Sequence, residues 1–283
     1  MAHLYRPREG WEDERLAHYL LSRFSFVAQP TTVADDVGAD FFCTIFDIVD
    51  APWPTVEPRS SFAIQVKSTL KAVNAHSKVS YLASLELPFF LGIVSQHPAQ
   101  IRLHSAERLS ILFARFGLPK KLWLRPVPME RYDGANYARG DAEVGVHLDC
   151  PCVATFGAEE TRSSLGAKVE ALNAICRQAS ANIGTRKAEE HVYDMGNGQF
   201  SIVAGCGSVN HFRQNFCRRL AEVFYNLTWI VNNQPAAFNH AEFKVYEDLY
   251  LGLRGIPGGA PLGAVARVYE PLRKQVTDRQ LDR

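Results

Sequence analysis

Residues 61–69 read SFAIQVKST, an apolar run that carries a glutamine and a lysine two positions apart. Side chains alternate across a strand, so Gln65 and Lys67 share one face and the apolar residues share the other. The apolar face is formed by Phe62, Ile64 and Val66. We predict that this face packs into the hydrophobic core. The polar face is expected to open on a cleft with an acidic neighbour, because a buried ammonium needs a carboxylate partner.

The preceding segment contains a suitable carboxylate. Residues 35–50 read DDVGADFFCTIFDIVD, in which a turn-forming DDVG precedes aromatic and β-branched residues typical of a strand. Asp40 falls near the start of this strand. Residues 51–60 contain three prolines and are expected to form an irregular connector. The two strands are predicted to pair as a hairpin, which brings Asp40 close to Gln65 and Lys67.

A helix is predicted before this hairpin. From residue 9 onward, apolar residues recur at helical spacing, with charged residues on the opposite face. The predicted core-facing residues are Leu16, Tyr19, Leu20 and Phe24. Glu14 lies at the edge of this stripe, so its carboxylate is expected to complete the acidic cluster. Glu12 is the alternative helix acid.

The segments after the hairpin continue an α/β pattern. FFLGIVS, which follows Pro88, predicts a strand buried on both faces. Residues 105–118 predict a helix with Ser105 as its N-cap and Gly117 as its stop. Farther along, we expect a strand pair over 143–157, a helix over 159–179, a strand over 198–205 and a long helix over 208–231. The buried stripe of that long helix is predicted to be Val209, Phe212, Phe216, Leu220, Val223 and Leu227.

The best candidate for a domain boundary is the Pro-, Gly- and Asp-rich stretch from Pro119 to Asp141, which reads as a loop. We therefore expect an α/β domain over 1–125 and a second α/β region over 126–283. The second region is expected to recognise substrate, to oligomerise, or to pack as an extension of the first.

Composition narrows the classes of function. Lys and Arg number 31 and Asp and Glu 30, so any nucleic acid must be held by local patches rather than by a global field. Apolar runs are too short for a membrane span and the N-terminal residues are too charged for a secretory signal, which predicts a cytoplasmic protein. The six cysteines lack regular spacing, so we expect reduced thiols rather than a zinc site.

Converging carboxylates and a lysine suggest metal-assisted phosphodiester hydrolysis. Oxygen ligands suit a hard divalent ion, which polarises phosphate and lowers the pKa of a bound water. The ammonium of Lys67 is then expected to orient that water and to offset charge that builds up on the phosphate. The sequence thus predicts a cleft built from Glu14, Asp40, Gln65 and Lys67.

The order Glu14, Asp40, Gln65-Val66-Lys67 resembles the PD-(D/E)XK, or restriction-endonuclease-like, nuclease superfamily. The resemblance covers roughly residues 9–96 and is greatest to a bacterial branch with a Gln-x-Lys tripeptide, which recurs among restriction and phage-defence proteins. It implies a mixed sheet flanked by helices. It also implies that Mg²⁺ or Mn²⁺ is held by Asp40, Gln65, the Val66 carbonyl and Glu14, and that Lys67 activates water.

The resemblance also sets the expected partner and the alternative function. It implies a cytoplasmic endonuclease that acts on nucleic acid, with DNA favoured over RNA, without a membrane partner; a homo-oligomer is compatible with these features. The sequence departs from the commoner pattern because Gln65 replaces a glutamate, which removes one negative charge from the metal site. The alternative is therefore a catalytically inactive nuclease-like module that binds nucleic acid or a protein.

Overall fold

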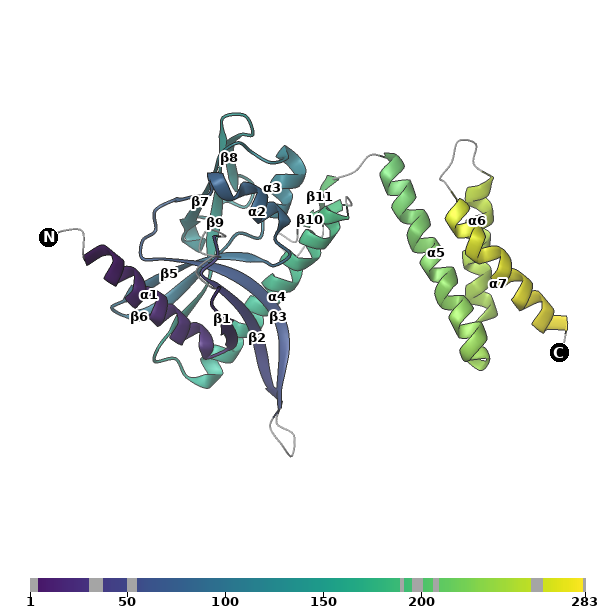
Figure 1. Ribbon diagram of the computed structural model, residues 1–283, viewed down its shortest axis with the longest axis horizontal. Coiled ribbons are helices and arrows are strands. Elements are labelled where there is room, and N and C mark those ends of the chain that lie inside the picture. Colours follow the sequence, from purple (N-terminus) through teal and green to yellow (C-terminus); the bar gives the residue numbers. More distant parts are fainter. Residues whose placement is uncertain are drawn as a thin grey trace. The chain divides into compact units, whose positions relative to one another are not determined.

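The computed structural model describes residues 5–30, 38–49, 55–188, 191–194, 201–205, 209–255 and 262–281. The chain forms two compact units, Met1–Cys206 and Gly207–Arg283, and each is considered by itself. The first unit is an α/β fold built on a mixed, open sheet, and the second is helical (Figure 1). The α/β class predicted from the sequence is confirmed.

The sheet of the first unit has nine strands. They are β1 (Ser25–Ala28), β2 (Phe41–Val49), β3 (Thr55–Lys67), β4 (Val73–Asn74), β5 (Phe89–Gln96), β6 (Ala99–Ser105), β7 (Leu122–Val127), β8 (Ala138–Asp141) and β9 (Gly145–Gly157). Their order is β1-β2-β3-β5-β6-β9-β7-β4, and β8 pairs with β9. The pairs β3–β5 and β7–β9 are parallel and the others antiparallel. A further pair, β10 (His191–Asp194) and β11 (Ser201–Gly205), forms a small separate sheet.

The predicted hairpin is present as β2 and β3. Phe41 lies opposite Ile64 and Val49 opposite Thr55, so the ladder is longer than expected, because β3 begins within the proline-containing segment. Gly38 has a φ of 95°, a value that suits glycine, and belongs to the predicted turn. Residues 35–37 of that turn lie outside the described residues. Figure 1 shows the hairpin extending beyond the rest of the sheet.

Two separate cores cover the two faces of the sheet. The alternation in β3 divides them, because Ile64 and Phe62 belong to one core and Ala63 to the other. The first core lies under α1 (Tyr5–Ser22) and α4 (Arg162–Lys187). The second lies under α2 (Val79–Ser84) and α3 (Leu109–Phe116), together with β7. The apolar face of β3, which carries Phe62 and Ile64, is therefore buried in the first core, as predicted.

Helix α1 confirms the predicted helix but presents a slightly different face. Ala17, Leu20 and Leu21 are fully buried, whereas Tyr19 is 54% exposed. The sequence prediction placed Tyr19 in the core and left out Ala17 and Leu21. The buried face of α1 is therefore rotated about the helix axis relative to the predicted one. Asp13, one turn before Ala17, is also buried and accepts a hydrogen bond from Gln96 at 3.1 Å. The opposite side of α1 faces solvent, which leaves Glu12 exposed.

The segment after residue 118 differs from the sequence prediction. The supposed loop over 119–141 contains β7 and β8, and residues 143–157 form one strand, β9, rather than a pair. Pro151 lies where β9 changes its partner from β7 to β6. Because β9 joins these strands into one sheet, no division falls after residue 125, and the compact units meet at 206/207. Residues 126–205 are thus an extension of the first fold.

A smaller difference concerns the start of α3. Strand β6 runs through Ser105, whose Oγ accepts a hydrogen bond from the Glu107 N–H at 3.2 Å, and α3 begins only at Leu109. Gly117 ends α3 as predicted, with a φ of 69°. Pro88 precedes β5, which is buried over most of its length, also as predicted.

The second unit consists of α5 (Val209–Asn233), α6 (His240–Arg254) and α7 (Gly263–Leu281). Its core contains Leu220, Phe224 and Leu227 from α5. Phe216 is 44% exposed and is not part of it, whereas the side chains of Val209 and Phe212 lie outside the described residues. The predicted α/β character of residues 126–283 therefore ends at β11. Within the described ranges, none of the helices combines the length and apolar character needed to span a bilayer.

Candidate functional site

Asp40 is fixed to β3 by two hydrogen bonds. Its N–H donates to the Ile64 carbonyl at 2.8 Å, and its Oδ2 accepts from the Val66 N–H at 2.5 Å. The carboxylate thus takes the place of a backbone carbonyl at the end of the β2–β3 ladder. In a strand the N–H and C=O of one residue point to the same side. The Val66 carbonyl is therefore directed to the same side of β3 as the carboxylate.

Gln65 and Lys67 occupy the opposite sheet face from Ile64. Phe41 pairs with Ile64, which places Asp40 beside Gln65. Gln65 is only 9% exposed, whereas Lys67 is half-buried. Among the described residues, Lys67 forms no hydrogen bond or ion pair. The structure therefore brings three of the predicted ligands together, Asp40, Gln65 and the Val66 carbonyl, with an uncompensated ammonium two residues farther along.

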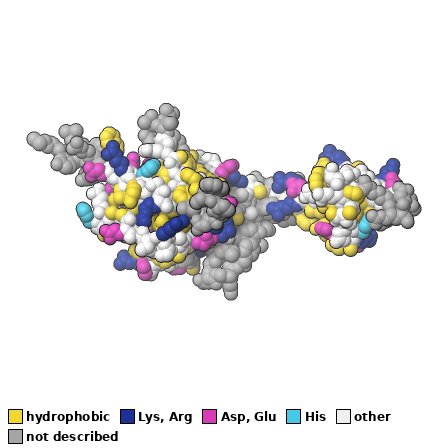
Figure 2. All heavy atoms as spheres, turned by 90° about the horizontal axis from the view of Figure 1, so that it is seen from below, with side chains coloured by type: hydrophobic (Ala, Val, Ile, Leu, Met, Phe, Trp, Pro, Cys, Tyr) yellow, Lys and Arg dark blue, Asp and Glu magenta, His cyan; other side chains and the backbone are white. Residues whose placement is uncertain are grey.

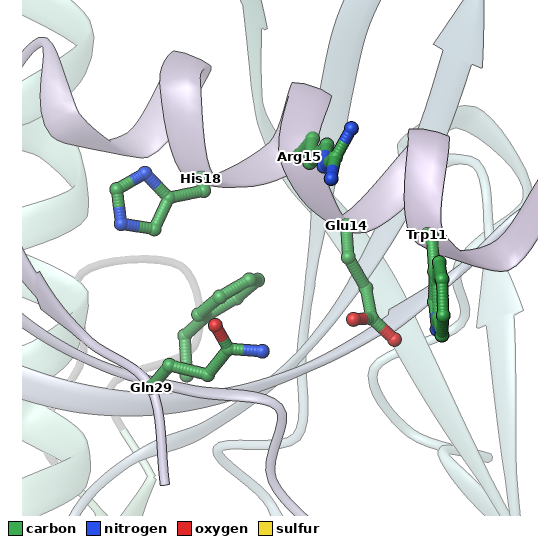
Figure 3. A pocket seen from close by; sticks show the side chains of 6 residues that line it. Trp11, Glu14, Arg15, His18 and Gln29 are labelled. Carbon is green, nitrogen blue, oxygen red and sulfur yellow. The ribbon is translucent and has the colours of Figure 1, made fainter.

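Glu14 reaches this strand end on the other face of the sheet. It lines a pocket of about 400 Å³ together with Trp11, Arg15, His18, Gln29 and Phe41. Figure 3 shows Glu14 and Trp11 extending from α1 toward Gln29. The His18 ring meets the Phe41 ring edge-on at 5.8 Å. Phe41 directly follows Asp40 in the chain, so Glu14 and Asp40 lie near the same strand end but on opposite faces of the sheet. The exposed Glu12 does not line the pocket.

The donor set fits a hard cation with few protein ligands. A carboxylate, a side-chain amide oxygen and a backbone carbonyl are all oxygen donors, and Mg²⁺ is commonly bound by one or two carboxylates, with waters and phosphates completing its shell. In the part of the chain that the structure describes, no group of three or more His, Cys, Asp or Glu side chains is arranged to hold a metal. Any metal at Asp40 thus depends on the neutral oxygens of Gln65 and Val66.

Sequence reasoning missed a second pocket on the face that carries Gln65 and Lys67. It measures about 530 Å³ and includes Arg102 and His104 of β6. A signal for it is present in the sequence, because residues 101–104 read IRLH and repeat the alternation of IQVK. Ile101 and Leu103 are buried in the first core, which turns the two polar side chains to the opposite face.

Comparisons of this chain with protein-family models, curated proteins and solved structures found no match. The interpretation of the site therefore depends on the contacts of Asp40, Gln65 and Lys67 and on the resemblance of their order in the sequence.

Proposed function

We propose that the chain is a divalent-metal-dependent nuclease that hydrolyses phosphodiester bonds, with DNA as the favoured substrate and a restriction-endonuclease-like core as its fold. The observation that carries the proposal is the position of the Asp40 carboxylate, which is hydrogen-bonded to the Val66 N–H beside the half-buried, unpaired Lys67. A role in restriction or phage defence remains a prediction from the resemblance.

The roles of the side chains follow from their charge and fixation. Asp40 provides the single negative charge, and its hydrogen bond to β3 keeps the carboxylate from rotating. The Lys67 ammonium, held on a rigid central strand, is placed to orient a water and to stabilise negative charge on a phosphate. Asp40, Gln65 and the Val66 carbonyl would hold the divalent ion, which would supply polarisation of the phosphate and a lower pKa of bound water.

Attraction of nucleic acid would depend on local groups. The net charge is +1, and Figure 2 shows Lys and Arg side chains interspersed with Asp and Glu over the face that it draws. A few unpaired cations, of which Lys67 is one, therefore contribute more to the attraction of nucleic acid than the net charge does.

A specific observation supports the alternative, a catalytically inactive nuclease-like module that binds nucleic acid or a protein. Gln65 leaves only one carboxylate beside the Val66 backbone, and Glu14 projects into a pocket on the other face. One carboxylate should hold a divalent ion more weakly than two. Calorimetric titration with Mg²⁺ separates the two functions, because the nuclease predicts binding that is lost in Asp40→Asn and the inactive module predicts none.

The activity test uses substitutions that spare the fold. Asp40→Asn keeps an oxygen that accepts the Val66 N–H while it removes the charge, whereas alanine would leave that N–H unsatisfied. Lys67→Met removes the ammonium and keeps the length of the side chain. Each should lower the rate of cleavage of single- or double-stranded DNA by about 10²-fold or more, in the presence of Mg²⁺ or Mn²⁺.

The matched control is Lys71→Met, because Lys71 is an exposed lysine four residues farther along. It should cleave like the wild type, and unchanged thermal unfolding should accompany all three substitutions. A folded wild type that cleaves neither DNA nor RNA with either metal would contradict the nuclease. Retained cleavage in Lys67→Met would instead show that Lys67 takes no part in the mechanism.

A further inference from the structure

The second pocket is built from five segments of the first unit. Its lining comes from the end of β3 onward, β6, the segment after β7, β9 and α4, and includes Leu70, Arg102, His104, Met129, Cys152 and Lys168. The volume of about 530 Å³ falls in the range of small-ligand pockets. The pocket is thus large enough for one nucleotide.

Strand register places this pocket on the same sheet face as the candidate site. Lys67 pairs with Ile93, Ile93 with Arg102, and Arg102 with Thr155, so these four residues form one row across β3, β5, β6 and β9. The next row contains Gln65, Leu91, His104 and Cys152. Neighbouring strands are about 4.8 Å apart, so the backbones of Lys67 and Arg102 lie about 10 Å apart along this row, close enough for both side chains to contact phosphates of one strand.

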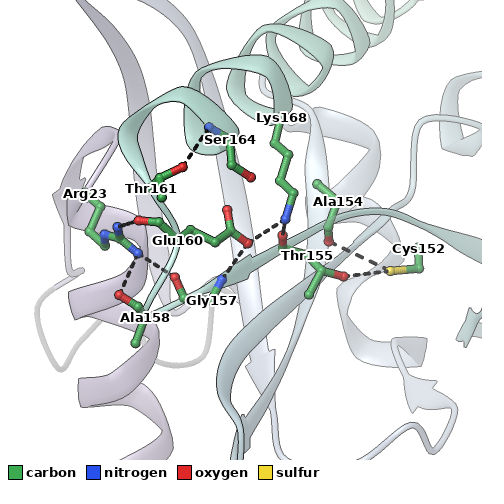
Figure 4. A network of polar contacts seen from close by, with 10 residues as sticks. All are labelled: Arg23, Cys152, Ala154, Thr155, Gly157, Ala158, Glu160, Thr161, Ser164 and Lys168. Carbon is green, nitrogen blue, oxygen red and sulfur yellow. Dashed lines mark hydrogen bonds and ion pairs between the residues drawn. The ribbon is translucent and has the colours of Figure 1, made fainter.

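Arg102 is the unpaired cation of the pocket. It is half-buried, its Nε is shielded from solvent, and its guanidinium forms no hydrogen bond or ion pair with the described residues. Lys168 differs, because its Nζ donates to the Thr155 carbonyl at 2.7 Å and to Glu160 at 2.5 Å (Figure 4). The Nε of Arg102 has thus lost hydration without compensation, and the planar fork of a guanidinium matches a phosphate.

The walls of the pocket are held in place. Figure 4 shows Arg23, which directly follows α1, binding the end of β9 and the turn after it, where it donates to the carbonyls of Gly157 at 2.5 Å and Ala158 at 3.0 Å. His104 is 1% exposed, and its Nδ1 lies 3.0 Å from the Cys150 carbonyl. Burial lowers the pKa of His104, although the carbonyls of Cys150 and Val127 favour the protonated ring. His104 is thus a buried, uncharged part of the pocket wall, and Arg102 carries the positive charge.

The rim favours a nucleotide over an isolated anion. Leu70 and Met129 are 43% and 50% exposed at the pocket, which suits contact with the flat apolar face of a base. Glu130 also lines the rim and opposes the entry of additional negative charge. One phosphate with an attached base matches this combination.

We propose that this pocket binds one nucleotide of a nucleic-acid strand, with its phosphate on Arg102, on the same strand that carries the phosphodiester at Lys67. The inference rests on the proposed function for the choice of ligand. It adds a binding site for a neighbouring nucleotide beside the proposed point of cleavage.

The test measures binding without cleavage. Fluorescence anisotropy of a labelled single-stranded oligonucleotide, in EDTA, compares the wild type, Arg102→Gln and Arg177→Gln. Arg177 is an exposed arginine of α4 outside the pocket lining. Arg102→Gln should weaken binding by about ten- to hundredfold and reduce the salt dependence by about one phosphate contact, whereas Arg177→Gln should leave both unchanged.

Cys152 gives a second readout that needs no substitution at Arg102. An oligonucleotide should slow alkylation of the half-buried Cys152, measured by peptide mass spectrometry. Inorganic phosphate and a free mononucleotide at millimolar concentration serve as competitors. Binding of the mononucleotide through Arg102 without binding of the oligonucleotide would overturn the assignment to a strand.

The outcomes for the two proposals are distinguishable. If the wild type cleaves DNA but Arg102→Gln binds and cleaves normally, the pocket is refuted and the nuclease stands. If no variant cleaves but Arg102→Gln still weakens binding, the pocket stands and the catalytic function fails. A wild type that binds no oligonucleotide overturns the pocket.

Discussion

Glu247 shows how a single charge is accommodated inside the helical unit. It is 8% exposed, and its carboxylate accepts hydrogen bonds from Tyr269 Oη at 2.7 Å and Lys244 Nζ at 2.9 Å. Burial raises the pKa of Glu247, but the hydrogen bonds from Lys244 and Tyr269 outweigh burial and leave its pKa below the ordinary 4.5. The ionised carboxylate is therefore the form that stabilises the fold.

A lowered pKa contributes stability above the unfolded pKa and loses it as the pH falls through the folded value. We expect the free energy of unfolding to decline below about pH 4.5, and Glu247→Gln to weaken that decline. Urea unfolding of the full chain between pH 3 and 6 measures it, with the exposed Glu270→Gln as the control. An identical pH dependence in wild type and Glu247→Gln would contradict the role of this carboxylate.

At the candidate site, alternation was enough to predict that Gln65 and Lys67 share a face, because it depends only on strand geometry. The hydrogen bond from Val66 to Asp40 was beyond prediction, since it requires the register of two strands across an irregular connector. The position of Glu14 was predicted only in part, because the rotation of α1 depends on which apolar residues its neighbours accommodate.

Among the elements, α4 is attached to the sheet by two kinds of contact. Leu172 is fully buried in the first core, whereas Arg59 of β3 forms exposed ion pairs with Asp47 and with Glu170 of α4. Leu172→Ala should lower the free energy of unfolding by about 2–5 kcal/mol. Arg59→Ala should lower it by no more than about 1 kcal/mol, because water and salt screen exposed pairs. Urea denaturation gives both values, and a larger effect at Arg59 would reverse this order.

The elements that the sequence predicted correctly include β5, which is a continuous apolar run, and α5, in which apolar residues recur at helical spacing. Strands β7 and β8 were missed because Pro126, Gly140 and their polar neighbours resemble a loop, although their partner β9 supplies the apolar contacts. Residues 143–157 were predicted as a strand pair, yet β9 continues through Pro151 because its partner changes there.

On the scale of the whole molecule, the two units have separate cores, and urea should unfold them in two steps. Leu172→Ala is expected to shift only the transition of the first unit. Leu272→Ala, in the core of the second, should shift only the other. Far-ultraviolet circular dichroism, combined with hydrogen exchange of α4 and α7, resolves the transitions. A single transition moved equally by both substitutions would show that the units unfold together.

The boundary at 206/207 could not be predicted from the sequence because it depends on pairing between strands distant in sequence.

The bond between Asp40 and Val66 also constrains how this protein can diverge. Under the proposed nuclease function, a duplicated copy released from catalysis would no longer need the charge at position 40, but it would still need an acceptor for the Val66 N–H. Loss of that acceptor costs about 1–3 kcal/mol, whereas asparagine preserves it. We therefore expect asparagine at position 40 in copies that have lost nuclease activity but retained the fold. Reconstruction of the substitutions at this position in diverged copies would test this expectation.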